Sequence, residues 1–198
     1  MKLKNIFNGI IYELTDANSN YIEMYHGGNK WYSEPELRPP SKGRYEFGPG
    51  IYFTNNYETA KNYAQGSNVV QLVKIDKNFK DMKLVSIEIN QALDFIKNKI
   101  PPKNRKNIQS DVIRYSERSG KTQIPLTVIN NLIVNWESGS GQIGVEIANF
   151  FAQSGADAIV EDRSGNEQWM VVFNPKIIKK YEVVKNVPVE NYQLPRVK

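Results

Sequence analysis

The sequence contains no cysteine, and His26 is its only histidine. The lack of thiols excludes disulfide bonds, thiolate zinc sites and cysteine nucleophiles. A metal site built from several histidines is excluded as well, and a Ser-His-Asp triad would have to use His26. We therefore expect no bound metal and a reaction that depends on other side chains.

Long apolar runs are also missing. No stretch reaches the roughly 18 apolar residues of a membrane span, and residues 1–7 lack the apolar run of a signal peptide. Hydrophobic residues make up 40% and charged residues 24% of the 198 positions, close to globular averages. These features predict a soluble, cytoplasmic protein without a membrane partner, and one domain over residues 1–198.

Strand patterns predominate at the two ends of the chain and helical patterns in the middle. Apolar alternation and β-branched runs predict strands over residues 21–26, 50–54, 69–75, 155–160, 169–173 and 176–184. The run at 169–173 is fully apolar, which predicts burial on both faces. Asn55 and Asn56 offer an N-cap for a helix that begins near Tyr57. Residues 29–50 read as a long loop and 185–198 as an extended tail.

Apolar residues at three- to four-residue spacing predict a helical insertion around residues 86–154. The expected helices cover residues 87–96, 124–136 and 144–153, and Pro101-Pro102 ends the first. Within this insertion, residues 97–121 hold eight basic residues against two acidic ones, a net charge of +6 when the whole chain carries +5. Such a segment, with Tyr115 in it, can follow a phosphate backbone and stack a base. A solvated surface is the alternative interpretation.

Three motifs occur in a fixed order. The first is His26-Gly27-Gly28, the second is Phe47 to Thr54 followed by Ala60 to Ala64, and the third is Gly155 to Val160 followed by Asn166 to Pro175. In this order, and with eleven residues from Tyr52 to Tyr63, they resemble the diphtheria-toxin-like branch of ADP-ribosyltransferases, which includes the poly(ADP-ribose) polymerases. The resemblance covers residues 21–75 and 155–180, whereas the middle helices resemble nothing known.

The resemblance implies an α+β fold with a split mixed β-sheet that binds NAD+ as co-substrate. Cleavage of the nicotinamide–ribose bond passes through an oxocarbenium-like sugar. The site must therefore orient the ribose, hold the nicotinamide and stabilise positive charge with a carboxylate. The resemblance assigns His26 to the adenosine-side ribose and the backbone of Gly27 to the carboxamide. It assigns Tyr52 and Tyr63 to the two sides of the nicotinamide ring.

The position of the carboxylate stays open between two residues. Direct matching of the aromatic strand places Gln168 where the family has its glutamate, and a shift of one residue places Glu167 there. Because a one-residue slip reverses the face to which a strand residue points, only one of the two can face the ribose without a bulge. A glutamine could bond the 2′-hydroxyl but supplies no charge, so the chemistry favours Glu167. The chain also departs from the family at Ala60 and Gly28, where relatives carry hydroxyl residues.

The expected function is that of an NAD+-dependent mono-ADP-ribosyltransferase, a microbial or phage toxin or effector that modifies a macromolecule. The basic segment favours a nucleic acid, RNA or DNA, slightly over a protein as acceptor. A catalytically inactive module that binds NAD+, ADP-ribose or nucleic acid is one alternative, which Gln168 at the catalytic position would favour. An NAD+ glycohydrolase, which labels no acceptor, is the other.

Overall fold

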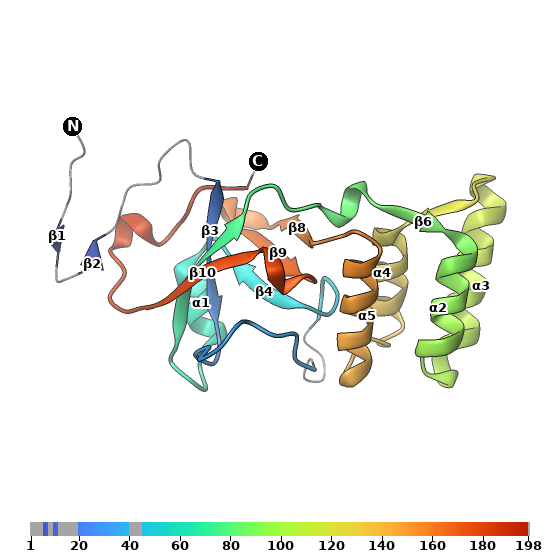
Figure 1. The fold of residues 1–198 in the computed structure, drawn as a ribbon, viewed down its shortest axis with the longest axis horizontal. Coiled ribbons are helices and arrows are strands. Elements are labelled where there is room, and N and C mark those ends of the chain that lie inside the picture. Colours follow the sequence, from blue (N-terminus) through green and yellow to red (C-terminus); the bar gives the residue numbers. More distant parts are fainter. Residues whose placement is uncertain (1–5, 8–9, 12–19, 40–44, 198) are drawn as a thin grey trace.

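A computed structural model describes residues 6–7, 10–11, 20–39 and 45–197. The molecule is elongated, with a β-sheet toward one end and four long helices toward the other (Figure 1). This is an α+β architecture, as the sequence predicts. The short strands β1 (Ile6–Phe7) and β2 (Ile10–Ile11) pair antiparallel as a separate two-stranded sheet. No helix in the described part of the chain is long and apolar enough to cross a bilayer.

Six strands form the main sheet in the order β10-β5-β3-β4-β9-β8. Their bounds are β3 (Tyr21–Gly27), β4 (Ile51–Thr54), β5 (Val70–Asp76), β8 (Ala158–Asp162), β9 (Gln168–Val172) and β10 (Ile178–Val184). Each lies within two or three residues of its predicted position. All residues of β9 are buried, as its apolar sequence predicts.

The pairings between these strands are all antiparallel, although the resemblance implied a mixed sheet. A parallel pairing occurs as an isolated bridge between Asp81 and Ala158. The short connection 163–167 between β8 and β9 explains part of this difference, because parallel neighbours need a much longer crossover.

The sheet is nearly divided between β3 and β4. Strand β3 pairs with β5 along its whole length, from Tyr21 opposite Asp76 to Gly27 opposite Val70. It pairs with β4 at one position, Tyr25 opposite Thr54. Two three-stranded halves therefore meet at a narrow join.

Helix α1 (Tyr57–Tyr63) lies against β3 and β4 near this join. Asn56 caps its N-terminus, as predicted, and its side chain accepts a bond from the Thr59 amide at 3.0 Å. A Cβ on Gly27 would lie 1.7 Å from the Ala60 carbonyl oxygen. Gly27 therefore lets the helix backbone approach the strand at a distance that no other residue type permits.

The predicted insertion contains α2 (Ile89–Lys99), α3 (Pro102–Ser119), α4 (Leu126–Asn135) and α5 (Gln142–Gln153). Strands β6 (Ser86–Glu88) and β7 (Gln123–Pro125) pair beside them, so residues 87–88 are extended rather than helical as we expected. The sequence did not predict α3. Pro102 stands in its first turn, where the missing N–H costs no hydrogen bond, so the proline pair separates two helices rather than ending helical structure.

The helices share one core with the edge of the sheet. Buried aliphatic residues from all four helices belong to one cluster, which also includes Val171 of β9 and Phe173. Helices α4 and α5 lie between the sheet and the α2–α3 pair in Figure 1. Four short 3₁₀ turns complete the structure: Met82–Leu84, Ser164–Asn166, Pro175–Ile177 and Val189–Asn191. Residues 28–39 and 45–50 form no helix or strand, as predicted for the long loop, of which residues 40–44 lie outside the described part.

Candidate active site

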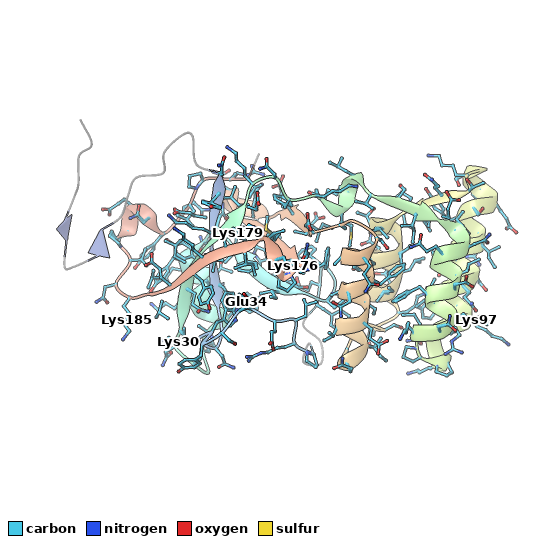
Figure 2. The ribbon with its side chains drawn as sticks, viewed as in Figure 1. Lys30, Glu34, Lys97, Lys176, Lys179 and Lys185 are labelled. Atoms are coloured by element: carbon cyan, nitrogen blue, oxygen red, sulfur yellow. The ribbon has the colours of Figure 1, made fainter. Side chains whose placement is uncertain are left out.

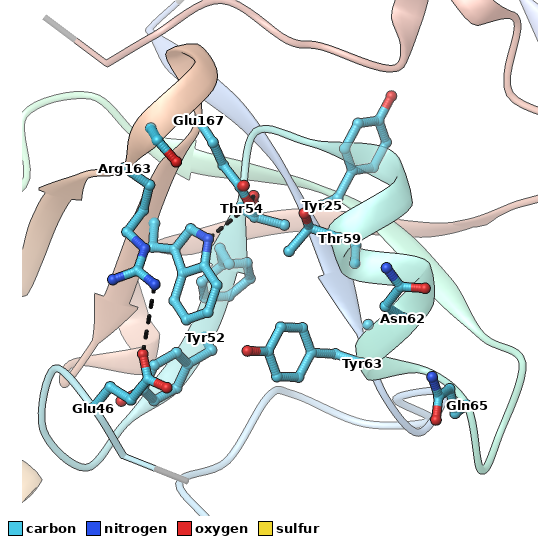
Figure 3. Close-up of a pocket in the computed structure, with 15 residues that line it drawn as sticks. Tyr25, Glu46, Tyr52, Thr54, Thr59, Asn62, Tyr63, Gln65, Arg163 and Glu167 are labelled. Carbon is cyan, nitrogen blue, oxygen red and sulfur yellow. Dashed lines mark hydrogen bonds and ion pairs between the residues drawn. The ribbon is translucent and has the colours of Figure 1, made fainter.

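A cavity of about 740 Å³ lies where β3, β4, β9 and α1 meet (Figure 3). Its size is in the range of about 300–1,000 Å³ that is usual for small-molecule sites. Residues from distant parts of the chain line it, among them Gly27, Tyr52, Tyr63, Arg163, Glu167 and Trp169. Gly27, Tyr52, Tyr63 and Glu167 are four of the six site residues that the sequence predicted.

Strand alternation brings the lining residues to one face of the sheet. Residues two apart on a strand share a face. Tyr52 and Thr54 of β4 line the cavity, and so do Glu167, just before β9, and Trp169 within it. Phe53, between the two β4 residues, also borders the cavity. Thr54 and Trp169 are directly opposite each other in the β4–β9 register, which places Glu167 beside the end of β4.

Two hydrogen bonds hold the carboxylate of Glu167. Its Oε1 accepts a bond from the Trp169 indole Nε1 at 2.7 Å and another from the Thr54 hydroxyl at 2.9 Å. Bonds of this kind to a charged acceptor are stronger than neutral ones. The negative charge is therefore fixed in direction before any ligand enters, which is the arrangement that stabilises a developing positive charge.

Aromatic rings form a wall beside this carboxylate. The indole of Trp169 meets Tyr63 edge-to-face, with ring centroids 5.5 Å apart, and meets Tyr52 in the same way at 6.3 Å. Tyr63 is 51% exposed. The structure thus brings Tyr52 and Tyr63 together as predicted, but it adds Trp169 between them.

The hydroxyl of Tyr52 is engaged with the loop before β4. It donates to the Gly48 carbonyl at 2.7 Å and accepts from the Phe47 amide at 3.2 Å. Burial raises the pKa of the Tyr52 phenol, with the Phe47 amide opposing the shift. The ring of Tyr52 therefore contributes a neutral surface to the cavity.

Arg163 carries the only positive charge among the described residues that line the cavity. Its guanidinium lies 5.0 Å from the centre of the Trp169 ring and 5.3 Å from that of Phe47. Its ion pair with Glu46, on the same side of the cavity, is long, at 3.8 Å (Figure 3). Sequence reasoning missed Arg163 and Trp169. The signal for Trp169 was present, because it stands two residues after Glu167 on one strand.

His26 does not line the cavity, although we expected it to converge there with Tyr52. Its neighbour Gly27 does, and adjacent strand residues point to opposite faces. The imidazole stacks on Trp31 at 4.6 Å, and its Nδ1 donates to the Tyr52 carbonyl at 2.8 Å. Burial lowers the pKa of His26, with this hydrogen bond opposing the shift. His26 thus joins the two halves of the sheet from the face opposite the cavity.

Gln168 likewise lies outside the cavity. Its side chain is buried, with Nε2 donating to Asp162 at 2.8 Å and Oε1 accepting from the Val197 amide at 2.6 Å. Of the two candidates for the carboxylate position, Glu167 is the one whose side chain lines the cavity. Gln168, where direct matching of the strand placed the glutamate, faces away from the cavity.

The basic segment 97–121 is remote from the cavity. It forms the end of α2 and all of α3, at the far end of the molecule, where Figure 2 places Lys97. Tyr115 packs against the helical core, which leaves less of its ring for a base than we expected. Arg105 donates to the Ile100 carbonyl at 3.1 and 3.0 Å, and Lys99 pairs with Glu146 at 3.0 Å.

In the described residues, no three carboxylates or imidazoles are grouped so that they could hold a metal ion. The cavity therefore offers a fixed carboxylate, an aromatic wall and one guanidinium. Comparison with known proteins found no matching family model, no similar curated protein and no similar solved structure.

Proposed function

We propose that the chain is an NAD+-dependent mono-ADP-ribosyltransferase with the α+β fold of the diphtheria-toxin-like branch. The observation that carries the proposal is the meeting of Glu167 with Tyr52 and Tyr63 in one cavity. Glu167 lies more than 100 positions along the chain from Tyr52 and Tyr63. An aromatic slot beside a fixed carboxylate is the arrangement that the reaction needs.

In this proposal the nicotinamide ring lies against Tyr63 in the aromatic wall of the cavity, and the adjoining ribose lies beside Glu167. The bond between ribose C1′ and the nicotinamide nitrogen breaks, and its electron pair leaves with nicotinamide. The positive charge that develops on the sugar faces the Glu167 carboxylate, which also accepts a bond from the ribose 2′-hydroxyl. An acceptor oxygen or nitrogen then attacks C1′ and loses its proton.

Arg163 provides the charge that the rest of NAD+ requires. A pyrophosphate carries two negative charges, and the cavity otherwise presents the carboxylates of Glu46 and Glu167. A guanidinium recognises phosphate oxygens in a bidentate manner. Because the ion pair with Glu46 is long and partly exposed, phosphate can displace it at little cost.

The acceptor proposed is a macromolecule, with nucleic acid slightly favoured over protein because of the basic segment 97–121. That segment lies beyond α4 and α5 from the cavity, so it would hold a nucleic acid at a second point rather than at the reacting atom (Figure 1). The proposed biological role is that of a cytoplasmic microbial or phage toxin or effector.

The test is incubation of the pure protein with NAD+ and of a cell lysate with protein and labelled NAD+. The proposal predicts that the pure protein releases nicotinamide and that a macromolecule in the lysate becomes labelled. If the acceptor is a nucleic acid, nuclease digestion should remove this label. Label that only protease digestion removes would place the acceptor among proteins. Release without label would indicate a glycohydrolase, and NAD+ binding without release an inactive module. If the protein neither binds NAD+ nor releases nicotinamide, the proposal is refuted.

A further inference from the structure

Glu167 ends the turn between β8 and β9, which is closed by a bond from the Arg163 amide to the Glu167 carbonyl at 2.8 Å. Gly165 and Asn166 both have positive φ, 71° and 63°, which is a sparsely populated region for asparagine. A slip of one residue in this turn would exchange Glu167 and Gln168 between the two faces of the sheet. The pairings of β9 with β8 and β4 set this register, and side-chain contacts from elsewhere in the chain add to it.

Asn55 bonds the peptide groups on both sides of Glu167. Its Oδ1 accepts from the Gln168 amide at 2.8 Å, and its Nδ2 donates to the Asn166 carbonyl at 3.3 Å. Its own amide donates to the Gln168 carbonyl at 3.1 Å. The side chain is fully buried. Each of these bonds would be lost if the chain slipped by one residue.

The C-terminal segment, residues 193–197, supports the same arrangement. The Leu194 amide donates to the Asn55 carbonyl at 2.8 Å, and Asn55 Nδ2 donates to the Leu194 carbonyl at 3.1 Å. Gln193 Nε2 donates to the Asn166 carbonyl at 3.3 Å. The bond from the Val197 amide holds Gln168 on the opposite face. A segment about 30 residues further along the chain thus secures the turn before β9.

We infer that Asn55, supported by Gln193 of the C-terminal segment, is a positioning residue that sets the direction of the Glu167 carboxylate. Asn55 touches the backbone around Glu167 and does not line the cavity. The catalytic value of that direction rests on the proposed function. The positioning itself does not rest on the proposed function, because the contact between Glu167 and Trp169 reports the direction of the carboxylate without any ligand.

The first readout is the indole N–H resonance of Trp169 in a two-dimensional NMR spectrum, assigned by its loss in Trp169→Phe. We expect Asn55→Ala to shift this resonance and to speed its exchange with water, because the bond to Glu167 loosens. The matched control is Gln71→Met. Gln71 is also fully buried, and its side chain also bonds the backbone on both sides of one residue, Lys30. Its Oε1 accepts from the Trp31 amide at 3.2 Å, and its Nε2 donates to the Asn29 carbonyl at 3.3 Å. It should leave the Trp169 resonance in place.

The second readout is kinetic. Asn55→Ala should lower the rate of nicotinamide release at saturating NAD+ at least tenfold, with the Kd for NAD+ changed by less than about threefold, whereas Gln71→Met should keep the rate. Gln193→Ala, an exposed change that leaves the core intact, should give a smaller effect in the same direction on both readouts. It replaces Asn55→Ala as the test if that variant does not fold. A wild-type Trp169 resonance in folded Asn55→Ala, or in Gln193→Ala if Asn55→Ala does not fold, overturns the inference. If wild type neither binds nor cleaves NAD+, the proposed function fails while the NMR comparison still decides the positioning.

Discussion

The indole Nε1 of Trp169 donates a hydrogen bond of 2.7 Å to the carboxylate of Glu167, two residues earlier in the chain. The bond joins the charged group of the cavity to its aromatic wall, so that neither can move without the other. It also explains why Glu167 lines the cavity and Gln168 does not, since Trp169 must share a face with its partner.

Replacement of Trp169 by phenylalanine should slow nicotinamide release about tenfold. The change removes one bond to a charged acceptor, worth about 1.5 kcal/mol or more, and tenfold in rate corresponds to about 1.4 kcal/mol. The control is Trp136→Phe, because the Trp136 indole also donates to a carboxylate, Asp111 at 3.1 Å, in the helical region. Equal rates in Trp169→Phe and wild type would show that this bond does not matter for the reaction.

Replacement of Arg163 by glutamine should weaken NAD+ binding about tenfold, whereas Glu46→Gln should strengthen it about two- to threefold. The first change removes the charge offered to the pyrophosphate, and the second removes a competitor for it. Calorimetry with NAD+, ADP-ribose and nicotinamide locates the effect, because nicotinamide alone carries no phosphate and should bind equally to all variants. A tenfold loss for nicotinamide as well would assign Arg163 to the aromatic wall instead.

Gly27→Ala should destabilise the fold by about 2–3 kcal/mol or more, because the new methyl group meets the backbone of α1. Gly66→Ala is the matched control, since a Cβ there meets nothing within 4 Å. Urea denaturation of the two variants measures the difference in the free energy of unfolding. Equal stabilities would mean that α1 can move away from β3 without loss.

Stability should fall as the pH drops below about 6.5, the ordinary pKa of histidine. Burial lowers the pKa of His26 in the folded state, so between the two values the unfolded chain binds a proton that the folded protein does not. The contribution is fully present above the unfolded pKa and is lost as the pH falls through the folded one. Because the chain has one histidine, His26→Gln should remove this dependence of the unfolding free energy on pH. The measurement is the free energy of unfolding of wild type and variant between about pH 5.5 and 7.5, at steps of about one pH unit. A curve with the wild-type slope would assign the dependence to other groups.

Local patterns were sufficient for most of the sheet and for α1. Apolar alternation and the Asn56 cap depend on neighbouring residues, and the predicted strands lie close to those observed. Apolar spacing did not predict α3, because this helix has few apolar residues and follows a proline pair. Its fully buried residues are Ile108 and Val112, which lie on one side of the helix.

The direction of individual side chains was harder to predict than the elements. The choice between Glu167 and Gln168 depends on Asn55 and on Val197, which are distant in sequence. For His26 the information was local, because Gly27 was expected in the cavity and the neighbouring side chain on a strand must face away.

The most direct test of the account is the rate of nicotinamide release by Glu167→Gln at saturating NAD+. Loss of the charge that faces the sugar should lower the rate about 10²–10³-fold, the scale observed when a single electrostatic group is removed from an active site. The Kd for NAD+, measured by calorimetry, should stay within about threefold, because Glu167 acts mainly on the charge that forms during bond cleavage. A wild-type rate in a folded Glu167→Gln variant that still binds NAD+ would contradict the account.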